Sequence, residues 1–253
     1  MKKCTLELGG NCPFIVFDDA NLEQALEQFM ALKWRHAGQA CITANRLYVQ
    51  AGVYDKFTEM LVEKTKALKV GHGGEDGTTM GPVTTPRGLT KAAAQAEDAV
   101  KNGAKLVLGT GKPEKNSTEE EGSGLGKGVG GYYMSPTILT NMSADMLMAR
   151  EETFAPVCGL FKFETEEQVV KWANETSMGL ASYAFTKNVD RLWRMFENLE
   201  AGMIGLNTGN ASAAESPFGG IKESGYGKES GKDVAVREYL IEKTGQFTIE
   251  GQY

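Results

Sequence analysis

Strand-like and helix-like segments alternate along nearly the whole chain, and this alternation restricts the fold more than any other feature. Runs of apolar and β-branched residues predict strands at residues 4–8, 11–17, 46–50, 104–108, 156–163, 181–186, 202–207 and 237–243. Apolar residues that recur at helical spacing predict helices at residues 22–30, 53–68, 91–102, 166–176 and 189–199. Strands separated by helices form βαβ units, so we expect a three-layer α/β/α fold with a largely parallel sheet.

Local signals mark where some of these elements begin and end. Asn21 can cap the first helix, and Gln24 stands three residues later, as in a capping box. Gly103 follows the helix predicted at residues 91–102, where glycine commonly ends a helix. The local signals therefore agree with the alternation.

The composition excludes several classes of partner. Of the 253 residues, 41% are hydrophobic and 24% are charged, which is ordinary for a globular protein. The formal net charge is -6, whereas nucleic acids and anionic membrane surfaces attract proteins with a basic face. No apolar run approaches the roughly 20 residues that span a bilayer. We therefore expect neither nucleic acid nor membrane as the main partner.

The cysteines and histidines do not suggest a metal site or a disulfide framework. Their spacing is irregular and fits no zinc motif, and the histidines are isolated. The residues concerned are Cys4, Cys12, Cys41, Cys158, His36 and His72. We expect no bound metal and a reducing compartment, either cytoplasmic or mitochondrial, because a removed transit peptide would leave no trace here.

Two segments have an unusual character. The chain enters a strand-like run at residues 4–8 almost at once, which predicts that it is a piece of a longer protein. Residues 111–131 are biased in composition, and we expect a flexible surface insertion at the glycine-rich residues 122–131. Their Gly-x-Gly pattern follows an acidic stretch rather than a strand, and Lys127 precedes Gly128 rather than Ser or Thr. Neither a dinucleotide fingerprint nor a phosphate loop is therefore indicated.

Cys41 is the first candidate for chemistry. It follows a glycine-containing turn, from His36 to Gly38, at the end of a predicted helix. Glycine lets a backbone approach a ligand closely, and a deprotonated cysteine is a strong nucleophile. Most single cysteines are nevertheless inert core residues, so this position alone would decide little.

Further motifs give Cys41 a context. The chain carries Glu-Leu-Gly-Gly at 7–10, Gly-Gln-Ala-Cys at 38–41 and Glu-Glu-Thr-Phe-Ala-Pro-Val at 151–157. Asn207 then precedes Pro-Phe-Gly-Gly at 217–220, and Lys-Glu-Ser-Gly-Tyr-Gly-Lys-Glu follows at 222–229. In this order and over essentially the whole chain, the motifs resemble the catalytic domain and C-terminal tail of aldehyde dehydrogenases.

The resemblance implies a domain division. Residues 1–245 would form the catalytic domain, and residues 246–253 would form a tail that serves as an oligomerisation strand. Most of the NAD-binding domain, roughly two hundred residues in such enzymes, would lie outside this chain. The isolated chain is accordingly expected to bind NAD poorly and to show little dehydrogenase turnover.

The resemblance also implies a mechanism. The Cys41 thiolate would attack the aldehyde carbon, and the Cys41 backbone N–H would bind the oxyanion. Hydride transfer to NAD or NADP would leave a thioester, which Glu7 would hydrolyse as general base toward water. Glu152 would hold the nicotinamide ribose, and Phe154 would pack against the nicotinamide ring. Ala155 stands where the family usually has glycine.

The substrate is expected to be an aldehyde with a carboxylate at its far end. Arg35 and Ser212 match an arginine and a serine that bind the substrate carboxylate in succinate-semialdehyde dehydrogenases. A guanidinium suits this task because it donates two parallel hydrogen bonds. Phe218, in the same loop as Ser212, joins the expected substrate-binding set. Thr43 stands where some relatives carry a second cysteine, so their local disulfide switch is not expected.

Two alternatives stay open at this point. The chain could be an inert fragment that only self-associates, in which case all its cysteines would react slowly with thiol reagents. It could also belong to an aldehyde dehydrogenase for another aldehyde, in which case loss of Arg35 would not discriminate between charged and neutral substrates.

Overall fold

A seven-stranded sheet forms the centre of the molecule, with the strand order β4-β5-β6-β3-β2-β8-β9. The computed structural model describes residues 2–114 and 131–251. All neighbours in this sheet are parallel except β4, which pairs antiparallel with β5. The strands are β2 (Cys12–Val16), β3 (Ala44–Gln50), β4 (Lys105–Leu108), β5 (Thr137–Thr140), β6 (Val157–Phe163), β8 (Ala181–Phe185) and β9 (Met203–Leu206). The predicted α/β class with a largely parallel sheet is confirmed.

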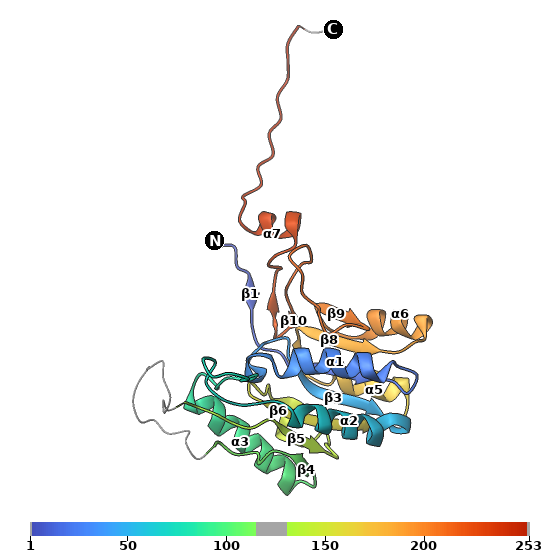
Figure 1. The fold of residues 1–253 in the computed structure, drawn as a ribbon. Helices are drawn as coiled ribbons and strands as arrows, with labels where there is room; N and C mark the ends of the chain where they lie inside the picture. The colour runs from blue at the N-terminus through green and yellow to red at the C-terminus, as the bar shows by residue number, and fades with distance from the viewer. Residues whose placement is uncertain (1, 115–130, 252–253) are drawn as a thin grey trace.

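Helices cover both faces of this sheet, as the ribbon in Figure 1 shows. Successive strand residues point to opposite faces, so Phe14 and Ile15 enter different cores. The core around Phe14 is closed by α1 (Leu22–Lys33) and α2 (Tyr54–Lys66). The core around Ile15 is closed by α3 (Pro86–Lys101), α5 (Glu166–Asn174) and α6 (Val189–Asn198). The fold thus has the three layers that the alternation predicted.

The first helix begins as expected, with one difference. The Asn21 side chain accepts a hydrogen bond from the Gln24 backbone N–H at 3.2 Å, so the cap is confirmed. The Gln24 side chain donates to the Asn207 carbonyl at 3.1 Å. Gln24 therefore links the start of α1 to the end of β9 by a hydrogen bond. The capping pattern alone did not predict this link.

Smaller elements surround the sheet. The predicted strand at residues 4–8 is reduced to β1 (Leu6–Glu7), which pairs with β11 (Gly225–Tyr226). β7 (Met178–Gly179) and β10 (Ile221–Lys222) form a second two-stranded antiparallel sheet. The remaining elements are η1 (Arg35–Gly38), η2 (Ala51–Val53), α4 (Leu147–Arg150) and α7 (Lys232–Glu238).

The strand predicted at residues 237–243 is wrong. Helix α7 runs through its start, and the chain beyond is irregular, with Leu240 56% and Ile241 88% exposed. A strand needs a neighbouring strand for its backbone hydrogen bonds, and none lies beside this segment within residues 2–114 and 131–251. In Figure 1 the segment instead leads away from the sheet toward the C-terminus.

The insertion predicted at residues 122–131 lies outside the described residues except for Gly131. Within the described residues, no helix has the length and apolar character needed to cross a membrane. The same residues contain no group of three or more His, Cys, Asp or Glu side chains that could hold a metal ion.

Candidate active site

One open cleft of about 610 Å³ gathers every residue that the sequence singled out for chemistry. These residues come from distant parts of the chain, and the structure brings all of them to the same place. The set consists of Glu7, Arg35, Cys41, Glu152, Phe154, Ser212 and Phe218.

The cleft lies at the amino ends of the parallel strands. Glu7 comes before β2, Cys41 before β3, and Glu152 before β6. Helix α1 starts after the carboxyl end of β2 and returns the chain toward the amino end of β3. The loop after β9 follows α1 in the same direction, since the Gly209 backbone N–H donates to the Gln28 side chain at 2.8 Å. This return places Ser212 at the cleft.

The backbone leading to Cys41 has an unusual conformation that explains its glycine. His36, Ala37 and Gly38 all have positive φ angles, of 52°, 54° and 74°. A Cβ atom added to Gly38 would lie 2.3 Å from the Ala155 carbonyl oxygen. Glycine is therefore required both for the left-handed turn and for its contact with the segment that carries Glu152.

Gly10 has a similar role on the other side of Cys41. A Cβ atom at Gly10 would lie 2.2 Å from the Cys41 carbonyl oxygen. Since real Cβ contacts are never so short, only glycine lets the loop of Cys41 pack this closely on the segment before β2. The glycines of the two motifs thus each pack against the backbone of a distant segment, Gly10 against Cys41 and Gly38 against Ala155.

Gln39 is a further cleft residue whose role the sequence did not indicate. Its side chain donates to the Pro82 carbonyl at 3.1 Å and accepts from the backbone and hydroxyl of Thr84, both at 2.8 Å. Through these hydrogen bonds, Gln39 connects the turn before Cys41 to the loop before α3. Its place inside the Gly-Gln-Ala-Cys motif was the only available signal.

Cys41 and Glu7 lie beside each other in the cleft. Burial, and then the neighbouring Glu7 carboxylate, raise the pKa of the Cys41 thiol to about 12, whereas the Ile42 backbone N–H lowers it. The half-buried thiol is therefore protonated at rest, and Glu7 is the carboxylate beside it. Among the described residues, no hydrogen bond engages the Cys41 backbone N–H, so this donor is free for an oxyanion.

Glu152 is fixed by the glycine motif before β2. The Gly10 backbone N–H donates to Glu152 Oε1 at 2.8 Å, and a Cβ atom at Gly9 would lie 3.0 Å from Glu152 Oε2. Burial raises the pKa of Glu152, while the Gly10 hydrogen bond lowers it. Close by, Phe154 is 42% exposed, so a flat apolar ring borders the same cleft.

Arg35 brings a positive charge to the cleft. It is the first residue of η1, and its side chain is exposed. Among the described residues, no salt bridge pairs it with an acidic side chain. Ser212 and the half-buried Phe218 line the cleft from the loop after β9. The cleft therefore combines a thiol, two carboxylates, an unpaired guanidinium and exposed aromatic surface.

Comparisons with known proteins agree with this geometry. Residues 1–244 match the model described as "Aldehyde dehydrogenase family". The chain is 45% identical over 240 residues to succinate-semialdehyde dehydrogenase [NADP(+)] 1 of Schizosaccharomyces pombe, covering 95% of this chain and 45% of the relative. It is 44% identical over 240 residues to glutarate-semialdehyde dehydrogenase of Pseudomonas putida, covering 95% and 46%.

A solved structure is similar as well. The crystal structure of aldehyde dehydrogenase from Brucella melitensis biovar abortus 2308 superposes with a TM-score of 0.85 at 49% identity, covering 95% of this chain and 46% of that chain. The chain thus spans about half the length of the relatives that it matches.

Proposed function

The chain belongs to the aldehyde dehydrogenase family, and from this we propose that it is the catalytic part of an NAD(P)-dependent enzyme that oxidises an aldehyde to the carboxylic acid. We further propose that the aldehyde has a carboxylate at its far end, with succinate semialdehyde as the best candidate. The position of the Cys41 thiol beside the Glu7 carboxylate, inside the cleft, carries this proposal.

The pair supports a covalent mechanism. Glu7 accepts the thiol proton as Cys41 Sγ forms a bond to the aldehyde carbon, and the free Cys41 backbone N–H stabilises the resulting oxyanion. The carbon then gives up a hydride, which leaves a thioester on Cys41. Glu7, after releasing its proton, removes a proton from water as that water attacks the thioester. The acid leaves, and the thiol is restored.

The cofactor position follows from Glu152 and Phe154. A carboxylate held by Gly10 can accept hydrogen bonds from ribose hydroxyls, and the exposed Phe154 ring offers a flat surface to a nicotinamide. NAD or NADP bound there would take up the hydride. The name of the Schizosaccharomyces pombe relative specifies NADP, and we propose either nucleotide for this protein.

Recognition of the far carboxylate is assigned to Arg35 and Ser212. An unpaired guanidinium at the cleft favours an anionic ligand, and a hydroxyl can donate one more hydrogen bond. Both relatives described above are named for aldehydes that end in a carboxylate, which supports this class of substrate. The Phe218 ring would pack against the apolar carbons between the aldehyde and the carboxylate.

The test has two arms. In the first, the chain is joined to the N-terminal half of the Schizosaccharomyces pombe relative, and NADPH formation is followed with succinate semialdehyde and with an uncharged aldehyde of similar length. Arg35→Ala should reduce kcat/KM at least tenfold for the charged substrate and little for the neutral one. An equal loss on both substrates would show that the substrate class is wrong.

In the second arm, the chain alone is incubated with p-nitrophenyl acetate, because acyl transfer to a thiol needs no hydride acceptor. Intact mass should show one acetyl group, and this group should be absent from Cys41→Ala. Equal acetylation of the wild type and the variant would refute Cys41 as nucleophile and favour an inert protein.

Assembly and location stay predictions. We propose that residues 246–253 pair with a second copy, since Phe247 and Ile249 of this segment are 86% and 58% exposed. A homo-oligomer in the cytoplasm or mitochondrion is expected.

A further inference from the structure

A second cysteine lies directly behind the nucleophile. Cys12 is the first residue of β2, and it is 1% exposed. Its thiol donates to the Cys41 carbonyl oxygen at 3.5 Å. Cys41 in turn packs against the apolar core of which Cys12 is a member. Cys12 and Cys41 are therefore in direct contact. Neither the catalytic steps nor the sequence motifs involve Cys12.

The geometry around Gly10 confirms how close the two residues are. A Cβ atom at Gly10 would lie 2.2 Å from the Cys41 carbonyl oxygen and 3.3 Å from Cys12 Sγ. A disulfide needs Cβ atoms roughly 3.5–4.5 Å apart. Because Cys12 Sγ contacts the main chain of Cys41, a disulfide between the two residues would require the Cys41 side chain to rotate away from Glu7 and toward Cys12.

The other cysteines are placed differently. Cys4 is exposed near the N-terminus, and Cys158 is buried in β6, next to β3. Among the described residues, the Cys12 thiol and not that of Cys158 forms a hydrogen bond to Cys41. Thr43 has its hydroxyl directed at the Leu32 carbonyl at 3.3 Å. Among the other cysteines of the described residues, Cys12 is thus the one whose sulfur contacts Cys41.

We propose that Cys12 is a resolving cysteine that forms a reversible disulfide with Cys41 when the nucleophile is oxidised by a peroxide. Cys41 Sγ attacks a peroxide oxygen, the O–O bond breaks, and Cys41 sulfenic acid and water form. The Cys12 sulfur then attacks Cys41 Sγ, and the sulfenic oxygen leaves as water with the Cys12 proton. Two thiols lose two electrons in total, and hydrogen peroxide is reduced to two waters.

Burial decides the order of these steps. Desolvation raises the pKa of Cys12 to about 12, and its side chain has almost no access to solvent. Cys41, which borders the open cleft, meets the peroxide first. The proposal rests on the proposed function only in treating Cys41 as the reactive thiol. The disulfide would block the nucleophile and protect it from irreversible oxidation to the sulfinic acid.

Peptide mapping of the 253-residue chain tests this directly. Trypsin leaves Cys4 and Cys12 in one peptide and Cys41 in another, so the experiment uses a Cys4→Ala background. After brief exposure to dilute hydrogen peroxide, we expect the mass of two hydrogens to be lost and the peptides of Cys12 and Cys41 to be linked. Dithiothreitol should restore both thiols and at least about 80% of the acetylation by p-nitrophenyl acetate.

Cys12→Ala in the same background is the decisive variant, and Cys158→Ala is the matched control for loss of a buried cysteine. We expect Cys12→Ala to accumulate sulfinic acid at Cys41 and to recover less than about a tenth of its acetylation with dithiothreitol. The control should behave like the parent. A free Cys12 thiol beside an oxidised Cys41 would overturn the proposal, and so would equal recovery in both variants. Absence of acetylation before oxidation would instead count against the proposed function, since the disulfide is read by mass.

Discussion

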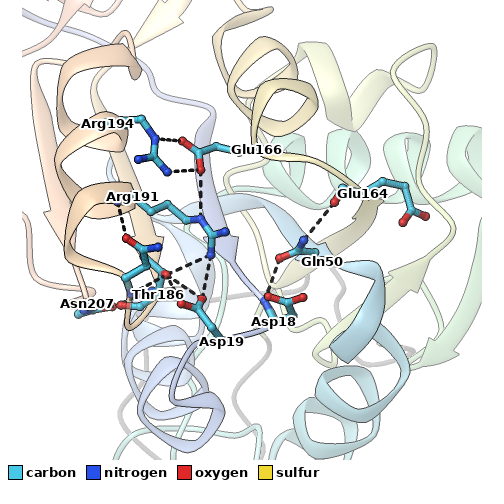
Figure 2. A network of polar contacts seen from close by, with 10 residues as sticks. Asp18, Asp19, Gln50, Glu164, Glu166, Thr186, Arg191, Arg194 and Asn207 are labelled. Atoms are coloured by element: carbon cyan, nitrogen blue, oxygen red, sulfur yellow. Dashed lines mark hydrogen bonds and ion pairs between the residues drawn. The ribbon is translucent and has the colours of Figure 1, made fainter.

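The two edges of the same parallel sheet are organised in opposite ways. At the carboxyl edge, charged side chains satisfy one another: Arg191 contacts Asp19 and Glu166, each at 3.1 Å, and Arg194 shares Glu166. The Thr186 hydroxyl donates to Asp19 at 2.7 Å. Figure 2 shows these side chains pointing toward one another from the loops and helices that follow the strands.

At the amino edge, the polar groups are left open instead. Arg35 has no salt-bridge partner among the described residues, and the Cys41 backbone N–H has no acceptor among them. Ligands of open parallel sheets usually bind at the carboxyl edge. Here the carboxyl edge is filled by its own ion pairs, whereas the open cleft lies at the amino edge.

The largest expected effect comes from Glu7→Gln at the amino edge. The amide keeps the shape of the carboxylate but cannot remove a proton from water, so hydrolysis of the acyl-enzyme should slow by about 10²–10⁴-fold. Acylation should slow as well, because Glu7 also takes up the thiol proton, but the acetyl group that does form should persist in the intact mass after a pulse of p-nitrophenyl acetate. Because Glu7 is exposed, the free energy of unfolding should change by less than about 0.5 kcal/mol. Unchanged deacylation would remove Glu7 from the mechanism.

Gly10→Ala tests whether the amino edge depends on close backbone packing. The new methyl group would meet the Cys41 carbonyl oxygen, and relief of this overlap should cost about 1–3 kcal/mol of unfolding free energy. Acetylation of Cys41 should slow as its loop moves. Gly81→Ala is the matched control, because a Cβ atom at Gly81 meets nothing within 4 Å. Equal urea midpoints for the two variants would contradict the packing argument.

Arg191→Ala tests the other side of the comparison. It removes contacts to Asp19 and Glu166 and a cation–π contact in which the guanidinium lies 4.4 Å from the Phe17 ring centroid. We expect a loss of about 1–2 kcal/mol in urea unfolding, since the side chain is only partly exposed. Acetylation of Cys41 should keep its wild-type rate. A slower rate would mean that the two edges are coupled through the sheet.

The amino edge could be predicted from the sequence to a large extent, because its residues occur in short motifs. The structure confirms that these motifs meet in one cleft, but their roles stay predictions. The motifs did not reveal why Gly10 and Gly38 are glycines, since the answer is the backbone of Cys41 and Ala155, far away in the sequence.

The carboxyl edge could not be predicted in this way. The partners of Arg191 lie on α5 and after β2, and no local spacing indicates such a pairing. The strand predicted at residues 237–243 fails for a related reason. An apolar run forms a strand only beside another strand, and the sequence of the run does not say whether one is there. Both cases depend on tertiary contacts rather than on local pattern.

The smallest predicted effect concerns Glu166 and acid. The hydrogen bond from Arg194, followed by that from Arg191, lowers the pKa of Glu166. A carboxyl whose pKa is lower in the folded than in the unfolded protein stabilises the fold above its unfolded pKa, and this contribution is lost as the pH falls through the folded value. Glu166→Gln should therefore cost about 1 kcal/mol or less at pH 7, and the difference from wild type should shrink below pH 4.5, the ordinary value. Urea unfolding at several pH values measures this difference.

Glu164→Gln is the matched control, because Glu164 is a nearby acidic residue that takes no part in these salt bridges among the described residues. It should show no such convergence. If the Glu166 difference stayed constant down to the lowest pH at which the protein folds, the carboxyl edge would be stabilised by the shape of its side chains rather than by their charges.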